Sequence, residues 1–166
     1  MKRAKQAGLA VSFDVNYRSK LWSVAKARSV LEDMIAGIDL LFCSKRDAMQ
    51  VLEIAGEPDE IVRQVAERFG VRSMAMSDSE NGVYGWENGR VTQMPAIKVD
   101  IVDRIGAGDA LAAGIIHGWL DSDFATGLEC GAIAAASAMS QNGDMLVINL
   151  EELNALYTHR GVQLSR

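Results

Sequence analysis

The sequence has few of the residues that build disulfide frameworks or metal sites. Its 166 residues include only two cysteines and two histidines. Cys43 and Cys130 lie far apart and lack the Cys-x-x-Cys or Cys/His spacing of a zinc site, so we predict two buried free thiols in a reducing cytoplasm. His117 and His159 have no partner at a catalytic or metal-binding spacing, which favours solvated or core positions for both.

Long apolar runs and excess positive charge are also absent. No segment reaches the roughly 18 continuous apolar residues of a membrane span. The net charge is −5, which argues against nucleic acid or an anionic membrane as the main partner, because both attract basic surfaces. With 49% apolar and 23% charged residues, the composition is that of one globular domain with an ordinary core.

Short apolar runs alternate with helical patterns along the chain. This alternation predicts an α/β fold, a parallel sheet with helices on both faces, in which ligands bind beyond the C-terminal ends of the strands. The pairs Asn81-Gly82 and Asn88-Gly89 separate short alternating runs and predict a β-hairpin. Strands are expected at 9–13, 39–43 and 71–77, and helices at 22–38, 46–55, 59–69, 107–120, 124–141 and 150–159.

The loop Gly106-Ala107-Gly108-Asp109 opens the helix expected at 107–120. Its glycines allow a ligand to approach the backbone, and the free N–H groups of a helix start form an anion site. A carboxylate there would repel a phosphate unless a substrate hydroxyl lies between them and gives Asp109 its proton. The other interpretation is an ordinary acidic residue that stabilises the helix start. The loop fits neither the Walker pattern nor Gly-x-Gly-x-x-Gly.

Longer strings around this loop carry a family resemblance. The segment 103–109, Asp-Arg-Ile-Gly-Ala-Gly-Asp, resembles the D-[TR]-x-G-A-G-D signature of the pfkB (ribokinase-like) carbohydrate kinases. Segments 13–23 (FDVNYRSKLWS) and 39–44, with Gly143-Asp144, resemble the 2-keto-3-deoxygluconate kinase branch over nearly the whole chain. The resemblance implies a ribokinase-like three-layer fold that phosphorylates a primary hydroxyl of a small sugar acid, with ATP and Mg²⁺.

The resemblance also implies the catalytic residue. Asp109 resembles the general base of the family. Gly106, Ala107 and Gly108 resemble the anion hole for the transferred phosphoryl group. These roles match the chemistry that the helix start favours by itself.

Substrate and nucleotide contacts are implied in the same way. Arg18 resembles the arginine that meets the acid substrate, and Asp144 an aspartate that reaches a substrate hydroxyl. Asn16, Ser77 and Gly82 resemble nucleotide-side residues. From residue chemistry alone, a surface salt bridge at Arg18, a loop-holding side chain at Asn16 and a plain turn at Asp144 remain open.

Two segments depart from the family pattern. The residues at 44–47, Ser-Lys-Arg-Asp, stand where the family usually has Asn-x-x-Glu, a motif that helps to organise magnesium. The shorter carboxylate of Asp47 leaves the metal ligands unassigned. The turn at 77–82 is more acidic than usual, and it would repel phosphates unless magnesium or lysines intervene.

The chain is also about half as long as members of the family. The resemblance therefore implies that 1–166 form the C-terminal nucleotide-binding and catalytic part, with the N-terminal half and the β lid absent. Such a sheet has a bare edge, which leaves self-association or association with the missing half as alternatives. A non-catalytic nucleotide-binding remnant and a fructokinase or ribokinase type of sugar kinase are the competing functions.

Overall fold

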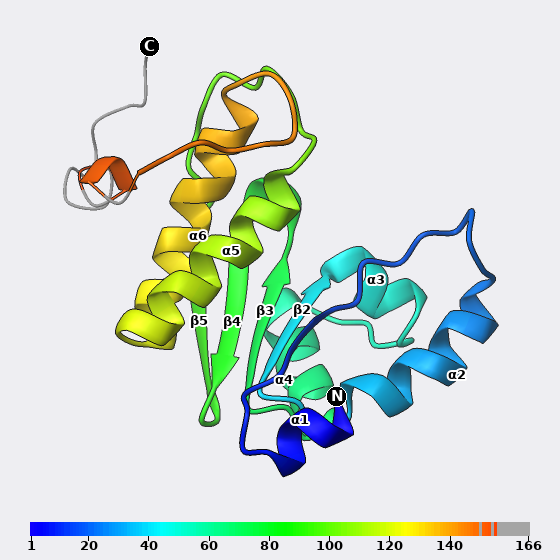
Figure 1. Ribbon diagram of the computed structural model, residues 1–166. Helices are drawn as coiled ribbons and strands as arrows, with labels where there is room; N and C mark the ends of the chain where they lie inside the picture. The colour runs from blue at the N-terminus through cyan, green and yellow to red at the C-terminus, as the bar shows by residue number, and fades with distance from the viewer. Residues whose placement is uncertain (150, 154, 156–166) are drawn as a thin grey trace. The chain divides into compact units, whose positions relative to one another are not determined.

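A computed structural model describes residues 1–149, 151–153 and 155 (Figure 1). The chain forms two compact units. The first contains 1–79 and 83–93, and the second contains 80–82 and the residues from Met94 onward. Most of the helix expected at 150–159, including His159, lies outside the described residues. None of the helices that are described is long and apolar enough to cross a membrane.

A five-stranded sheet forms the framework of the first unit. Its strands follow the chain order, from β1 at one edge to β5 at the other. The first three strands are parallel and β4 runs antiparallel to β3, so the sheet is mixed rather than wholly parallel. The strands are β1 (Ser12–Asp14), β2 (Leu40–Ser44), β3 (Ser73–Ser77), β4 (Val83–Glu87) and β5 (Arg90–Met94).

The predicted hairpin joins β4 to β5. Asn88 and Gly89 have φ angles of 51° and 79°. Both lie in the left-handed region that a two-residue hairpin turn of type I′ requires, which explains the Asn-Gly pair. The hairpin adds β5 to the edge of the sheet beyond β4, which is itself antiparallel to β3.

The core of the first unit lies between the sheet and its helices. These helices are α1 (Lys2–Gln6), α2 (Val24–Ile35), α3 (Lys45–Gln50) and α4 (Pro58–Phe69). Leu41 and Met74 of the sheet belong to one buried cluster with Leu31 and Ile61 of the helices. Each such side chain stabilises the fold by about 1.5–3 kcal/mol. The alternate residues of β2 and β3 are buried too, as expected for strands between two layers.

Local signals explain where the helices begin and end. α4 begins with Pro58 and a capping box between Glu57 and Glu60, and it ends at Gly70 with φ of 61°. The helix predicted at 46–55 was too long, since α3 ends at Gln50. Glu53 has a φ of 54°, a left-handed conformation that interrupts the helix.

The second unit is built on a pair of helices, α5 (Ala107–Asp121) and α6 (Phe124–Met139). Glycines line their contact. A Cβ at Gly118 would lie 2.7 Å from the Cα of Gly127, and one at Gly114 would lie 2.7 Å from the Cα of Gly131. The two backbones therefore touch, which offsets the roughly 1 kcal/mol that a glycine costs inside a helix.

Candidate active site

Gly106 is the residue from which helix α5 starts. It is the N-cap and has a φ of 80°, in the left-handed region. A Cβ at this position would lie 2.5 Å from the carbonyl oxygen of Asp144. Glycine is therefore needed here for two separate reasons, backbone conformation and close approach.

The start of α5 carries hydrogen-bond donors that the helix itself does not use. The first bond of the helix runs from the N–H of Ala110 to the oxygen of Gly106, at 2.9 Å. The N–H groups of residues 107–109 precede it and have no acceptor within the helix, and a glycine N-cap offers no side-chain oxygen. Apart from its chain neighbours and the backbone of α5 itself, no atom of the described residues would lie within 4 Å of a Cβ at Gly108. This helix start has the features of an anion site.

Two predicted aspartates lie at this end of the second unit. Asp109 is the third residue of α5 and is exposed, as is Asp144. Leu146, two residues after Asp144, packs against the buried cluster of Ala110, Ala134 and Ala138. The structure thus brings the backbone of Asp144 against Gly106.

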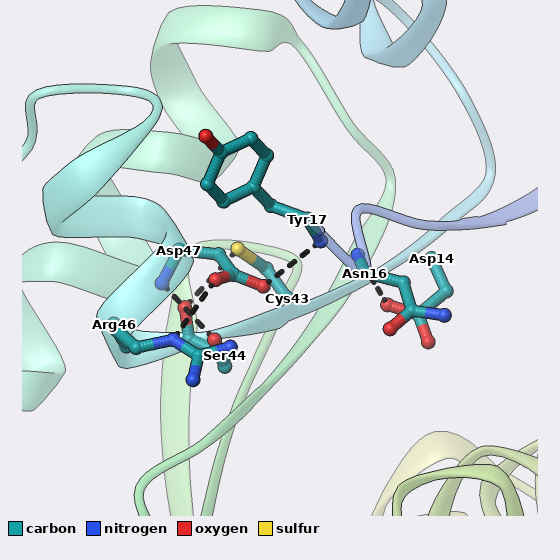
Figure 2. Close-up of polar contacts among 7 residues, drawn as sticks. All are labelled: Asp14, Asn16, Tyr17, Cys43, Ser44, Arg46 and Asp47. Atoms are coloured by element: carbon teal, nitrogen blue, oxygen red, sulfur yellow. Dashed lines mark hydrogen bonds and ion pairs between the residues drawn. The ribbon is translucent and has the colours of Figure 1, made fainter. Parts of the chain in front are cut away.

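The loop after β1 presents the other predicted pair. The N–H of Val15 donates to the oxygen of Phe42 at 3.0 Å, which extends the pairing of β1 with β2. Asn16 has a φ of 39°, and its N–H donates to the carboxylate of Asp14 at 3.2 Å. Figure 2 shows this turn. Asn16 and Arg18 are exposed, so both side chains are free to meet a ligand in solution.

Asp47 lies in the first turn of α3, beneath this loop. Ser44 is the last residue of β2, and its Oγ accepts the N–H of Asp47 at 3.0 Å. One carboxylate oxygen of Asp47 accepts the N–H of Tyr17 at 3.3 Å, and the other accepts Nε of Arg46 at 3.2 Å (Figure 2). The sequence interpretation treated Asp47 only as a doubtful metal residue and missed this contact.

A cavity of about 670 Å³ opens at the C-terminal ends of β2 and β3, where Ser44 is paired with Ser77. Nζ of Lys45 lies 3.0 Å from Oδ2 of Asp78 in its wall. This lysine compensates one acidic residue of the turn at 77–82. Among the described residues, the lining consists of Ser44, Lys45, Arg46, Met49, Gln50, Ser77, Asp78 and Ser79.

Gly82 ends that turn and belongs to the second unit. Its φ is 94°, and a side chain there would collide with the carbonyl oxygen of Met94 and lie 2.6 Å from the nitrogen of Ala96. The backbone therefore requires glycine at this position whatever the turn binds.

The two cysteines are buried and free, as predicted. Burial raises the pKa of Cys43, and the nearby carboxylates of Asp47 and Asp14 act in the same direction. Burial also raises the pKa of Cys130. Both thiols stay protonated at neutral pH, which does not suit a nucleophile.

Comparison with known proteins gives the family. The family model described as "pfkB family carbohydrate kinase" matches residues 1–155. The chain belongs to the pfkB family. Among its pfkB relatives, a 2-dehydro-3-deoxygalactonokinase from Haloferax volcanii is 32% identical over 154 residues, which cover 92% of this chain and 48% of the relative. A fructokinase from Klebsiella pneumoniae is 32% identical over 152 residues, covering 82% of this chain and 48% of the relative.

A solved kinase structure has the same fold. The 2-dehydro-3-deoxygluconokinase from Thermotoga maritima superposes with a TM-score of 0.82 and 27% identity, over 95% of this chain and 52% of that one. The predicted α/β, ribokinase-like fold is thereby confirmed. The chain spans about half the length of the relatives it matches.

Proposed function

We propose that this chain supplies the nucleotide-binding and phosphoryl-transfer part of an ATP-dependent kinase for a small sugar acid of the 2-keto-3-deoxygluconate type. The observation that carries the proposal is the start of α5, where free N–H groups, the open backbone at Gly108 and the exposed Asp109 occur together. Names of relatives that act on 2-dehydro-3-deoxy sugar acids support this substrate class.

Asp109 acts as the general base in this proposal. It takes the proton of a primary hydroxyl as that oxygen bonds to the γ-phosphorus of ATP and the bond to the departing ADP oxygen breaks. The N–H groups of the loop formed by Gly106, Ala107 and Gly108 stabilise the charge on the transferred group. Arg18 binds the substrate carboxylate through its planar fork, and Asp144 accepts a substrate hydroxyl.

The nucleotide side consists of Asn16, Ser77 and Gly82. Ser77 lines the cavity in which Lys45 already compensates Asp78. The part of the chain that the structure describes has no group of three or more His, Cys, Asp or Glu that could hold a metal ion. Mg²⁺ commonly relies on one or two carboxylates together with substrate phosphates. These residues therefore fit an Mg²⁺ held mainly by ATP, where it would neutralise phosphate charge.

The assay for this function follows ADP release from ATP, Mg²⁺ and 2-keto-3-deoxygluconate. We expect Asp109→Asn to lower kcat by about 10²–10⁴-fold, the usual worth of a general base. Asp121→Asn is the matched control, because it removes the same charge from the exposed far end of α5. Unchanged turnover in Asp109→Asn would show that Asp109 is not the base.

A non-catalytic nucleotide-binding protein is a second candidate. It is favoured by the buried contact of Asp47 with Tyr17. Asp47 stands in the position of the family's metal motif, but its carboxylate accepts a backbone N–H group. Titration calorimetry with ATP separates the two functions. Binding without turnover on any sugar acid supports the second.

Fructose phosphorylation is the third candidate, favoured by the K. pneumoniae relative named a fructokinase. A neutral sugar does not need a cation. If the substrate is the keto acid, Arg18→Ala should raise its KM, because the variant loses the cation that binds the carboxylate. KM for fructose should be unchanged by the same substitution. Preference for fructose over the acid in a substrate panel would contradict the acid-sugar proposal.

A further inference from the structure

Asp47 is a buried acidic residue to which the proposed reaction assigns no role. Its side chain is only 4% exposed, and it lies in the first turn of α3. Burying a carboxylate is costly unless its oxygens are hydrogen-bonded. Its partners therefore indicate what the residue does.

Those partners connect α3 to the loop after β1. Oδ2 of Asp47 accepts the N–H of Tyr17 at 3.3 Å, while Oδ1 accepts Nε of the mostly exposed Arg46 at 3.2 Å. The N–H of Tyr17 belongs to the peptide that joins it to Asn16. Asp47 therefore holds the backbone between Asn16 and Arg18 (Figure 2).

Buried and exposed residues alternate along the loop at 15–18. Val15 and Tyr17 are buried, whereas Asn16 and Arg18 are exposed. The hydroxyl of Tyr17 donates to the oxygen of Trp22 at 3.0 Å. The buried Val15 and Tyr17 thus fix the backbone, which sets the positions of Asn16 between them and of Arg18 directly after Tyr17.

We propose that Asp47 is a positioning residue, whose carboxylate holds the Asn16–Tyr17 peptide so that Arg18 meets the substrate carboxylate. The functional part of this inference rests on the proposed function, since it takes Arg18 as the substrate contact. Asp47 does not line the cavity beside it, among the residues that the structure describes. It acts through the backbone rather than on a ligand.

The first test needs no ligand. Amide hydrogen exchange at Tyr17, followed by NMR, is expected to be about tenfold faster in Asp47→Ala, roughly the factor that one net hydrogen bond is worth. Asp47→Asn should keep the protection, because its amide oxygen can still accept the N–H. Unchanged exchange at Tyr17 in Asp47→Ala would overturn the proposal.

Asp39→Ala is the matched control for exchange. Oδ2 of Asp39 accepts the N–H of Val11 at 2.9 Å, a contact of the same kind just before β1. This variant should speed exchange at Val11 and leave Tyr17 protected. Equal deprotection of Tyr17 in both variants would mean general loosening of β1, which contradicts a specific role for Asp47.

The second test is kinetic. Asp47→Ala should lower kcat/KM for the sugar acid by about ten- to hundredfold, as small misplacements in active sites do. In an Arg18→Ala background it should cost little more, because both changes remove one interaction. Additive losses in the double variant would overturn the link to Arg18.

The Mg²⁺ requirement of the Asp47 variants distinguishes a positioning role of Asp47 from a role as a metal ligand. A positioning carboxylate predicts that Asp47→Asn has near-normal kcat/KM and an unchanged Mg²⁺ requirement. If Asp47→Asn is as poor as Asp47→Ala and needs more Mg²⁺, the carboxylate acts on the metal and the proposal is wrong. Asp47→Asn keeps the side-chain shape, so it decides this point even if Asp47→Ala does not fold.

The two proposals fail in different ways. If the wild-type chain turns over no sugar acid, the proposed function is wrong, and the substrate role of Arg18 falls with it. Exchange at Tyr17 still decides whether Asp47 holds the loop, because that measurement involves no substrate.

Discussion

Gly106 and Gly108 stand two residues apart in the same loop and face opposite constraints. Gly106 has a φ of 80° and lies against the backbone of Asp144. Gly108 is helical, and a Cβ there would meet no atom of the described residues within 4 Å outside its chain neighbours and the backbone of α5. One glycine is required by the fold, and the other leaves room at the helix start.

We therefore expect Gly106→Ala to lower the free energy of unfolding by about 1–3 kcal/mol, the usual cost of a strained backbone position. Gly108→Ala should change it by less than about 1 kcal/mol, since alanine suits a helix better than glycine. Urea unfolding, followed by a signal from the second unit such as Trp119 fluorescence, measures the free energy of unfolding of both variants. Equal stability of the two variants would contradict the strain argument.

Residue patterns predicted the start of α5 at Ala107 but not the contacts of the loop before it. The anion site and the base that the string at 103–109 indicated stay predictions. The contact of Gly106 with Asp144 joins residues far apart in the chain, and no local pattern reports it. The contact of Asp47 with Tyr17 was missed because the partner is a backbone N–H group, which every residue except proline carries.

At the scale of elements, helix α6 shows how a single cap couples structure to pH. The carboxylate of Asp123 accepts the N–H of Thr126 at 2.7 Å. This backbone hydrogen bond is the main reason that the pKa of Asp123 is lowered. A lowered pKa in the folded state means that the stabilisation is present above the unfolded value, near 3.9, and is lost as pH falls through the folded value.

Asp123→Ala should therefore destabilise the protein by about 1 kcal/mol at pH 7, the usual cost of losing an N-cap. Asp123→Asn keeps a capping oxygen but does not titrate. Between pH 5 and pH 2 it should lose less stability than the wild type, as measured by urea midpoints at each pH. Parallel loss of stability in both proteins would show that Asp123 does not contribute to the acid transition.

Most elements followed from sequence patterns. β2 and β3 came from short apolar runs, and the β4–β5 hairpin came from Asn88-Gly89. The strand expected at 9–13 lies instead at Ser12–Asp14, and Leu9 is exposed. The C-terminal end of α3 was wrong because a left-handed Glu53 has no signature in the sequence. Neither glycine nor asparagine occupies that position, so only the packing of the segment sets its conformation.

At the scale of the whole molecule, ligand binding and stability are linked. A ligand that binds only the folded chain stabilises it by about 2.7 kcal/mol when its concentration is a hundred times Kd. ATP with Mg²⁺ should therefore raise the melting temperature above that seen with either alone. Asp109→Asn should keep this shift, since the base is not assigned to nucleotide binding.

A thermal shift assay over a range of ATP concentrations measures this effect. An unchanged melting temperature at millimolar ATP would contradict nucleotide binding by the chain, whatever its catalytic activity. A shift with ATP but no turnover would instead favour the non-catalytic candidate.

The glycine contact between α5 and α6 also limits how the site can change. If the register of α5 on α6 shifted by one residue, Ile115 would stand in place of Gly114 and Trp119 in place of Gly118, where only bare backbone fits. The helix pair therefore has a single register, which fixes the position of the start of α5, with Asp109, along α6. A change in the proposed site therefore has to come from substitutions in its loops, because a shift of α5 would disrupt its packing against α6.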